Sequence, residues 1–351
     1  MKKWLSHIIY IAALAVVTSC SSDLTDESAL SEKVNVTFTL AMNGSSPARS
    51  VDETWGDGYT PSEIGDDKDN LIDVNGLQVL IYSVEGNGQL TYWKKVEQIL
   101  TTQDPTNKNI YHFTGSLSIV KKQIPQTLRI MVFANCPNEI EGTELSGLQY
   151  QKETSIDYAA ERIPMWGVAT YADLKLLPGT SEDLGTIYLL RAMAKVEVTL
   201  DETIQDYSLE NVELNKYNSK GNCLPNGYSE KTETTEFGVE TVFNPSSSLV
   251  NGALPFSKLG NNRYVVYIPE YNNEGEGNTA RIEVTLNKKG GQPVKLNEPY
   301  IYFRNGEDFN IIRNHYYQFN ITSVNDSNLE LAIQYQVSDW DDKGNHNITF
   351  N

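Results

Sequence analysis

Apolar and polar residues alternate along much of the chain, with the period of two that is typical of strands with one buried face. The first run is Val34–Leu40, whose apolar positions are Val34, Val36, Phe38 and Leu40. The runs Leu77–Val84 and Thr127–Asn135 are denser in apolar residues and predict central strands buried on both faces. Further alternating runs occur at Ala194–Leu200, Arg263–Glu270, Arg281–Asn287, Tyr316–Val324 and Leu329–Trp340.

Turn-forming segments rich in glycine and asparagine separate many of these runs, and the 20 tyrosines favour pleated, half-buried surfaces. We therefore predict an all-β protein built from β-sandwiches, with a short helix within Gly142–Arg162 as the exception. The 351 residues suffice for two domains of ordinary size. A fresh alternating strand after an extended segment places the boundary between them near Leu189–Arg191.

The first twenty residues have the plan of an export signal rather than of a folded element. Lys2 and Lys3 precede an apolar run, Ile8–Val17, that is too short to span a membrane permanently. The segment ends in "VVTSC", which resembles the lipobox of bacterial lipoproteins, so Cys20 is predicted to carry the lipid. An ordinary signal peptide that happens to contain a cysteine is the alternative.

The formal charge of −18 at pH 7 suits solubility outside the cell and argues against binding nucleic acid. The sequence contains no glycine loop for nucleotides, no catalytic triad pattern and no pair of histidines at metal-ligand spacing. The carboxylates of Gly65–Asp73 are interpreted as a solvated acidic loop and not as a calcium site. We therefore expect a structural or binding protein with no enzyme activity, catalytic residue, metal or cofactor.

Two cysteines remain once Cys20 is set aside, namely Cys136 and Cys223. They are far apart in the sequence and are expected in different domains, free or buried rather than bridged. Neither lies near a constellation of histidine and aspartate, which argues against a role as a thiol nucleophile.

A loose segment follows the first strand and contains Arg49, the only basic residue between Lys33 and Lys68. Its sequence, "NGSSPARSVDETWGDG", offers the extended, accessible peptide that an arginine-specific protease requires. An ordinary surface arginine is the alternative interpretation.

Several motifs, in order along nearly the whole chain, resemble the fimbrillin family of Bacteroidales, the FimA-type subunits of lipoprotein-derived (type V) pili. They are the lipobox at Cys20, "VNVTFTLAMNGSSPARSVDE", "LIDVNGLQVLIYSVEGNG", "LRIMVFANCP", "IPMWG", "LLRAMAKVEV" and "IIRNHYYQFNITSV" followed by "LAIQYQVSDW". Each motif is short, and their joint order carries the resemblance.

The resemblance implies two transthyretin-like β-sandwich domains in tandem. The expected limits are a lipoprotein signal peptide at 1–19, a tether and propeptide with the first strand at 20–49, an N-terminal domain at 50–188 and a C-terminal domain with a donor-strand tail at 189–351. It also implies a subunit of an adhesive fimbria that the lipoprotein export machinery delivers to the outer membrane. There the precursor would be surface-exposed and anchored by lipid.

Processing and polymerisation are implied by the same resemblance. A trypsin-like, arginine-specific protease would cut between Arg49 and Ser50 and release the first strand, Val34–Leu40. The vacated groove would then accept a donor strand from another pilus subunit. The expected donor positions alternate along the last strand and continue into the tail: Leu331, Ile333, Tyr335, Val337, Trp340, Ile348 and Phe350.

Other readings stay open at the level of sequence. A monomeric outer-membrane lipoprotein that binds a glycan or a host ligand would retain its lipid and show no cut after Arg49. A pilus anchor subunit would also keep its lipid, whereas a stalk subunit would lose it. The last alternating run would pack in the second domain, while the part beyond Trp340 reaches out to a partner.

Overall fold

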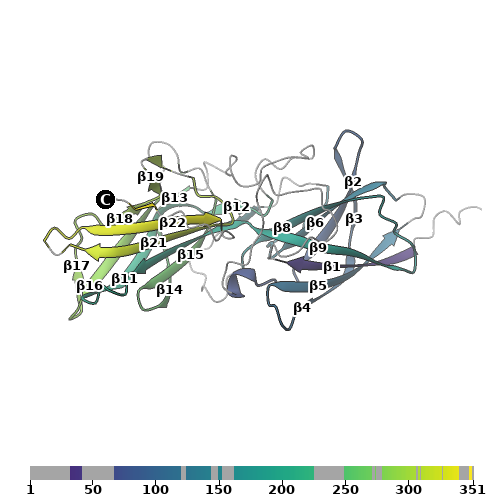
Figure 1. The fold of residues 1–351 in the computed structure, drawn as a ribbon. Coiled ribbons are helices and arrows are strands. Elements are labelled where there is room, and N and C mark those ends of the chain that lie inside the picture. The colour runs from purple at the N-terminus through teal and green to yellow at the C-terminus, as the bar shows by residue number, and fades with distance from the viewer. Residues whose placement is uncertain are drawn as a thin grey trace, which may run out of the picture.

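The fold of the protein consists almost entirely of β-strands (Figure 1). The computed structural model describes residues 32–41, 67–119, 124–143, 149–151, 162–224, 249–270, 273, 279–305, 307–308, 310–325, 327–339 and 348–349. Within these residues the only helix is a short 3-10 turn, η1 (Asp67–Asn70), and no helix is long and apolar enough to cross a membrane. The prediction of an all-β protein is confirmed in this part of the chain.

An eight-stranded sheet forms the half of the molecule that we call the N-terminal lobe. Its strands are β1 (Glu32–Ala41), β2 (Gln78–Val84), β3 (Leu90–Lys95), β4 (Glu97–Gln103), β5 (Ile110–Ile119), β6 (Thr127–Ala134), β8 (Met165–Ala172) and β9 (Ser181–Arg191). They are ordered β3-β2-β6-β8-β9-β1-β5-β4. Residues 181–188 of β9 pair in parallel with β1, and residues 189–191 pair antiparallel with β8. Because β9 changes its partner, the single sheet can form sandwich-like layers around a core.

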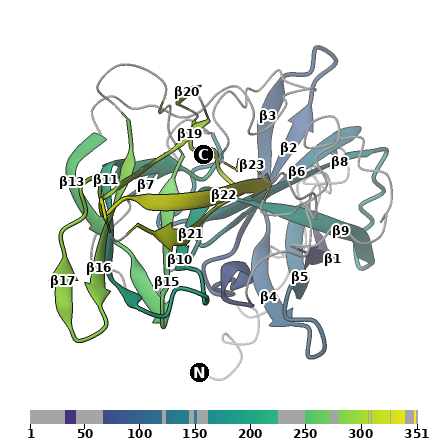
Figure 2. The same cartoon turned by 60° about the vertical axis from the view of Figure 1, so that its left-hand side comes forward.

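A six-stranded and a five-stranded sheet form the other half, which we call the C-terminal lobe (Figures 1 and 2). The first is ordered β14-β15-β10-β21-β22-β23, and the second is ordered β13-β11-β16-β17 with β18 paired to β16. Their strands are β10 (Met193–Leu200), β11 (Tyr207–Asn218), β13 (Leu249–Pro255), β14 (Ser257–Gly260), β15 (Arg263–Pro269), β16 (Arg281–Lys288), β17 (Gln292–Val294), β18 (Tyr300–Tyr302), β21 (His315–Val324), β22 (Leu331–Asp339) and β23 (Ile348–Thr349).

Each lobe has its own hydrophobic core. One cluster of buried side chains comes from residues 34–193 with three contributions from later segments, and the other comes from residues 194–335. The change from one core to the other falls between Met193 and Ala194, at the start of β10. Figure 1 shows the lobes side by side along the length of the molecule. The transthyretin-like topology and the domain limits stay predictions.

The two dense apolar runs form central strands buried on both faces, as predicted. β6 is buried from Leu128 to Ala134, and its neighbour β2 is buried from Val79 to Tyr82. The chain that follows β6 covers part of the outer face of this sheet, where Tyr82 Oη donates to the Gly142 carbonyl at 3.0 Å. This cover explains why neither run shows the polar positions of a half-exposed strand.

Two short strands from distant parts of the chain connect the lobes. β7 (Gln149–Gln151) and β12 (Lys220–Asn222) pair antiparallel, and a second short pair joins β19 (Arg304–Asn305) to β20 (Glu307–Asp308). β7 lies within Gly142–Arg162, and most of the remaining segment lies outside the described residues, so the short helix expected there stays a prediction. The backbone hydrogen-bond partners of β7 lie on β12, and the sequence around β7 gives no sign of this pairing.

Candidate functional site

The predicted lipidation and cleavage sites lie outside the described residues. This holds for Cys20, Arg49 and Ser50, and near the other end of the chain for Trp340 and Phe350. The structure does describe the first strand and most of the closing hairpin. The roles of these two elements in release and donation stay predictions.

The first strand, β1, lies inside the sheet of the N-terminal lobe and not at its edge. It pairs antiparallel with β5 along its whole length, from Glu32 opposite Ile119 to Ala41 opposite Ile110. On its other side it pairs in parallel with β9. Both rows of its main-chain groups therefore face neighbouring strands of the same chain.

The alternating apolar face of β1 is buried in the core. Val34, Val36, Phe38 and Leu40 are each at most 3% exposed. Phe38 also stacks on Phe113, with 3.9 Å between the ring centroids. Burying four such side chains is worth roughly 6–12 kcal/mol before conformational entropy is counted. Contacts of this strength hold the strand independently of its covalent connection.

β1 joins two parts of the sheet that share no other ladder in the described residues. β5 and β4 lie on one side of it, and β9 with the remaining strands lies on the other. Loss of β1 would leave unpaired N–H and C=O groups on β5 and β9 beside an apolar trench. Such an opening is an aggregation hazard unless another strand fills it.

Truncation of Phe38 is expected to destabilise the uncut protein strongly. Phe38→Ala removes a buried, stacked ring, so we expect a loss of about 3–5 kcal/mol in the free energy of unfolding. Thr39→Ala, at the next, half-buried position of the same strand, is the matched control and should cost less than about 1 kcal/mol. Urea denaturation measures both losses, and equal values would contradict this assignment of the buried face.

The closing hairpin consists of β21 and β22, which pair antiparallel near the edge of the six-stranded sheet. Leu331 and Ile333 pack against the core of the C-terminal lobe. Tyr335 is buried and stacks on Phe319 with 5.7 Å between ring centroids, and Val337 continues the strand. The first half of the predicted donor segment thus packs in its own lobe.

The last described strand, β23, pairs antiparallel with β22 of the same chain. Thr349 lies opposite Gln334, and Ile348 lies opposite Tyr335. The strand has two residues and forms the outermost member of the six-stranded sheet. Because each main-chain hydrogen bond contributes only about 0.5–1.5 kcal/mol, a ladder this short can be exchanged for another at small cost.

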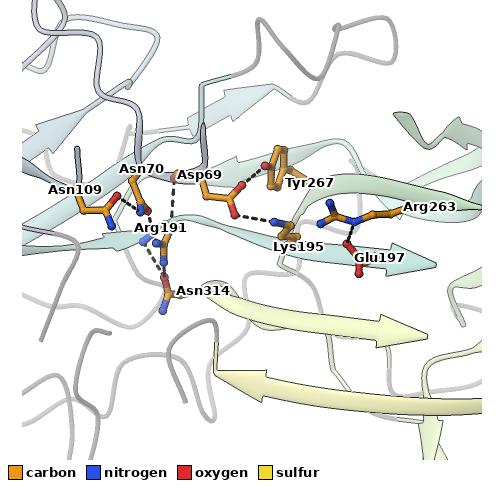
Figure 3. Close-up of polar contacts among 9 residues, drawn as sticks. All are labelled: Asp69, Asn70, Asn109, Arg191, Lys195, Glu197, Arg263, Tyr267 and Asn314. Carbon is orange, nitrogen blue, oxygen red and sulfur yellow. Dashed lines mark hydrogen bonds and ion pairs between the residues drawn. The ribbon is translucent and has the colours of Figure 1, made fainter. Parts of the chain in front are cut away.

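A buried polar junction joins the two lobes (Figure 3). Lys195 Nζ lies 2.7 Å from Asp69 Oδ2, and the two side chains are 2% and 0% exposed. The hydroxyl of Tyr267 donates to the other oxygen of the same carboxylate. Asp69 belongs to η1, whereas Lys195 and Tyr267 belong to β10 and β15 of the C-terminal lobe. The pair therefore ties the segment that follows Arg49 in the chain to the opposite lobe.

A second group of contacts fixes η1 at the same junction (Figure 3). Arg191, the last residue of β9, donates to the Asn70 side chain and, at 3.4 Å, to the Asp69 carbonyl. Its Nη1 donates to Asn314 Oδ1 at 3.1 Å, and Asn70 Nδ2 donates to Asn109 Oδ1 at 2.7 Å. These partners satisfy the polar groups that the junction buries.

The interpretation of Gly65–Asp73 as a solvated acidic loop is wrong for its centre. Asp69 is fully buried and Asn70 is 1% exposed, although Asp73 is exposed. The run of carboxylates suggested a loop exposed to solvent. The sequence around Asp69 does not reveal its partner, Lys195, because that residue lies 126 positions later. The sequence "AKVEV" offered no clue, because Lys195 stands at a polar position of a strictly alternating strand, where exposure to solvent is the usual expectation.

A more open ion pair continues the polar line along the surface of β10 (Figure 3). Glu197 Oε2 lies 2.7 Å from Arg263 Nε, and Arg263 is 39% exposed. Burial, and next the Glu197 carboxylate, raises the pKa of Tyr316 well above its usual value, so the phenol stays neutral. Its ring lies 5.0 Å from Lys195 Nζ, which adds a cation–π contact to the junction.

No protein-family model matches the chain, and no curated protein matches its sequence. Its structure is similar to fimbrial and adhesion proteins of Bacteroidales. One is a fimbrial assembly protein from Parabacteroides distasonis, 12% identical, with a TM-score of 0.45 over 88% of this chain and 98% of that chain. Others are candidate cell adhesion proteins from Bacteroides fragilis (7% identity, TM-score 0.44, 89% and 99% covered) and Bacteroides ovatus (10% identity, TM-score 0.41, 90% and 99% covered).

The histidines of the described chain make local contacts. His112 Nε2 lies 3.0 Å from Asp104 Oδ2 at the surface, and His315 Nδ1 lies 2.8 Å from the Arg313 carbonyl. Within the described ranges, no group of three or more His, Cys, Asp or Glu side chains is placed to hold a metal ion.

Proposed function

We propose that this protein is a structural subunit of an adhesive cell-surface fimbria, exported as a lipoprotein and polymerised by strand exchange after a cut between Arg49 and Ser50. One observation carries the proposal: β1 lies between two partner strands, yet it precedes a segment with a single, isolated arginine. A cut at that arginine would separate β1 from the lobe that it completes.

An internal strand is a favourable place for exchange, because its groove recognises the replacement on both edges and on one face. A donor between β5 and β9 would regain two main-chain ladders. Large side chains at alternate positions of the donor would fill the sites of Val34, Val36, Phe38 and Leu40. Each burial is worth roughly 1.5–3 kcal/mol, so the groove favours a strand with the same period of two.

The tail of the chain is the proposed donor. The segment "DWDDKGNHNITFN" has too few apolar residues to form a domain, but it carries Trp340, Ile348 and Phe350. The preceding part of β22 stays packed in its own lobe through Tyr335, so the tail leaves from a fixed base. In the fibre, β23 would leave β22 and pair in the groove of the next subunit.

The proposed partners are other subunits of the fibre, a trypsin-like, arginine-specific protease and the lipoprotein export machinery. Lipid on Cys20 would hold the precursor at the outer membrane, since each buried methylene contributes about 0.8 kcal/mol. Cys20 and β1 lie on the same side of Arg49, so one cut would remove the anchor and open the groove together.

Engineered cysteine pairs test the exchange. Thr349→Cys with Gln334→Cys should form an intramolecular disulfide in the uncut monomer, because the two positions are paired there. Protein that is cut and polymerised under reducing conditions and only then oxidised should not form this bond, whereas monomer in which the bond has formed should not polymerise. Thr349→Cys should then link to His112→Cys or Thr114→Cys, two exposed positions of β5, in a different molecule.

These variants carry serine at Cys20, Cys136 and Cys223 for work with purified protein. A fibre whose subunits keep the bond between positions 334 and 349, or links that form only within one chain, would overturn the donor assignment.

Deletion of residues 341–351 is the companion test and should give folded, cut subunits that do not extend a fibre. A lipid-bearing monomer without a cut after Arg49 would favour a surface lipoprotein that binds a glycan or a host ligand.

A further inference from the structure

A short sequence in the tail repeats part of the first strand. Residues 35–38 of β1 read "NVTF", and residues 347–350 read "NITF". Three of the four residues are identical, and the remaining one replaces valine by isoleucine, which is one methylene larger. This pattern of Asn, Val or Ile, Thr and Phe occurs at these two places only in the sequence. The tail therefore carries a copy of part of the strand that it is proposed to replace.

The repeated residues of β1 occupy two buried sites of different size. Val36 is 1% exposed and lies opposite Gly115 of β5, and Phe38 lies opposite Phe113, on which its ring stacks. A Cβ atom at Gly115 would lie 2.3 Å from Val96 Cγ1 and 3.1 Å from the Phe113 ring, so the space beside Val36 is already filled. The first site therefore suits a short β-branched side chain, and the second suits an aromatic ring.

The threonine between these two sites faces the other side of the sheet. Thr37 lies opposite Thr114 of β5 and opposite Asp183 of β9. Its hydroxyl donates to the Glu182 carbonyl at 3.5 Å, a contact that a threonine at the same place in a donor strand can make again. Both faces of residues 36–38 thus have a counterpart in the sequence of the tail.

We propose that residues 347–350 of one copy take the place of residues 35–38 in a second copy, in the same direction and the same register. Ile348 would then occupy the site of Val36, and Phe350 would stack on Phe113. The donor would run antiparallel to β5 and parallel to β9, as β1 does (Figure 1). The inference rests on the proposed strand exchange and adds its register, its direction and the identity of the partner.

The order of small and large side chains distinguishes this register from its neighbours. A shift by one residue would turn Ile348 and Phe350 away from the core. A shift by two residues would either force the Phe350 ring into the valine site or place Ile348 in the site of Phe38, which leaves a cavity. Only the register of the repeated sequence puts a β-branched side chain beside Gly115 and an aromatic ring on Phe113.

The repeat favours a second copy of this chain over a different subunit as the partner. One sequence supplies both the groove and a copy of the strand that fills it. A tail that fits the groove of a different subunit has no need to resemble the first strand of its own chain. Contacts between the groove of one copy and the tail of the next are heterologous, and such contacts continue into an open filament when they do not close into a ring.

Single cysteines in two kinds of molecule test the register. The acceptor carries Thr114→Cys and is cut after Arg49, whereas the donor carries Thr349→Cys and stays uncut, so a link between these cysteines must join two molecules. Both carry serine at the three native cysteine positions. In the proposed register Thr349 takes the place of Thr37, directly opposite Thr114, so mild oxidation of the mixture should give this link.

Acceptors with His112→Cys or Ser116→Cys are the matched controls, because these residues lie two positions away from Thr114 on either side. Diagonal neighbours are about 7–8 Å apart, and a disulfide needs a Cβ separation of roughly 3.5–4.5 Å. Both controls should therefore link far less than Thr114→Cys. Uncut chain with Thr37→Cys and Thr114→Cys should form the bond internally, which shows that this pair of positions accepts a disulfide.

The outcomes separate the register from the exchange itself. A dominant link at position 112 or 116 would overturn the register and leave the tail as the donor. No link at any of the three positions would overturn the proposed donor, and this inference with it.

Peptides of residues 339–351 give a second test that does not depend on disulfides. The proposed register brings His346 to the place of Val34, which is fully buried, and Asn345 to the place of Lys33, which is exposed. His346→Val should lower by about tenfold the peptide concentration that displaces the fragment ending at Arg49. Asn345→Val adds the same side chain on the other face and should change that concentration little.

A peptide with Ile348→Phe and Phe350→Ile keeps the composition and reverses the order of the two large side chains. It should need at least about a tenfold higher concentration than the parent peptide, because the ring no longer meets Phe113 and overfills the valine site. Equal displacement by the reversed and parent peptides, or equal gains from the two valine variants, would overturn the register.

Discussion

Lys195→Met is expected to lower the free energy of unfolding by about 3–5 kcal/mol. The lysine is 2% exposed, and its ammonium lies 2.7 Å from the carboxylate of Asp69, which is fully buried. Loss of the cation leaves a negative charge in the interior without its counter-charge, and this uncompensated charge accounts for most of the expected cost. Urea denaturation of the purified chain measures the loss.

The neighbouring pair Arg263–Glu197 supplies a matched control (Figure 3). Its N–O distance is the same 2.7 Å, but Arg263 is 39% exposed, so water screens the interaction. Arg263→Met should therefore cost less than Lys195→Met, with part of its cost coming from Glu197, whose side chain is 8% exposed and loses its counter-charge. Similar losses for the two substitutions would show that burial does not determine the strength of the Lys195 contact.

A double-mutant cycle separates charge from packing at the junction. Asp69→Asn removes the negative charge and keeps an acceptor for the Tyr267 hydroxyl. Combined with Lys195→Met, it should give a protein about 1–3 kcal/mol more stable than the sum of the single losses predicts. Strictly additive losses would assign the effect to side-chain packing instead.

The junction also determines what a cut after Arg49 would leave behind. η1 is the first described element beyond that arginine, and Asp69 binds it to the C-terminal lobe through Lys195 and Tyr267. A cut would therefore free β1 at one end while the chain beyond η1 stays fixed. Stability of the cut subunit depends on this connection until a donor strand arrives.

Alternation of apolar residues predicts which strands form and which faces they bury. The apolar face predicted for β1 is the buried one, and the dense runs became β2 and β6, which are buried on both faces. Local order suffices for this, because side chains alternate between the two faces of any strand. The order of strands is not local: nothing in residues 34–40 indicates that β5 and β9 are the neighbours.

β10 shows where reasoning from the pattern fails. Ala194, Val196 and Val198 enter the C-terminal core as alternation predicts. The polar residues between them, Lys195 and Glu197, are also buried, at 2% and 6% exposure. A polar residue in a strand normally faces solvent. Lys195 is buried instead, because a carboxylate from η1 pairs with it. That partner comes from tertiary structure.

Arg49→Ala is expected to abolish fibres and to leave uncut, lipid-bearing monomer on the cell. Without the cut, β1 remains covalently joined to the lobe that it completes, so the groove between β5 and β9 stays occupied. N-terminal sequencing of protein sheared from cells should begin at Ser50 in the parent. Ser46→Ala, in the same segment, is the control and should leave fibres intact. Parent fibres whose subunits begin before Ser50 would contradict the assignment of the cleavage site.

The cut alone is not expected to release β1, because the strand keeps both ladders and four buried side chains worth roughly 6–12 kcal/mol. After an arginine-specific protease has cut purified precursor, the fragment that ends at Arg49 should co-elute with the rest of the chain in size-exclusion chromatography. It should leave when cut subunits or a peptide of residues 339–351 is added, at a rate that rises with donor concentration. Immediate loss of the fragment without a donor would contradict this exchange. It would show instead that β1 dissociates first and that a donor strand fills the empty groove afterwards.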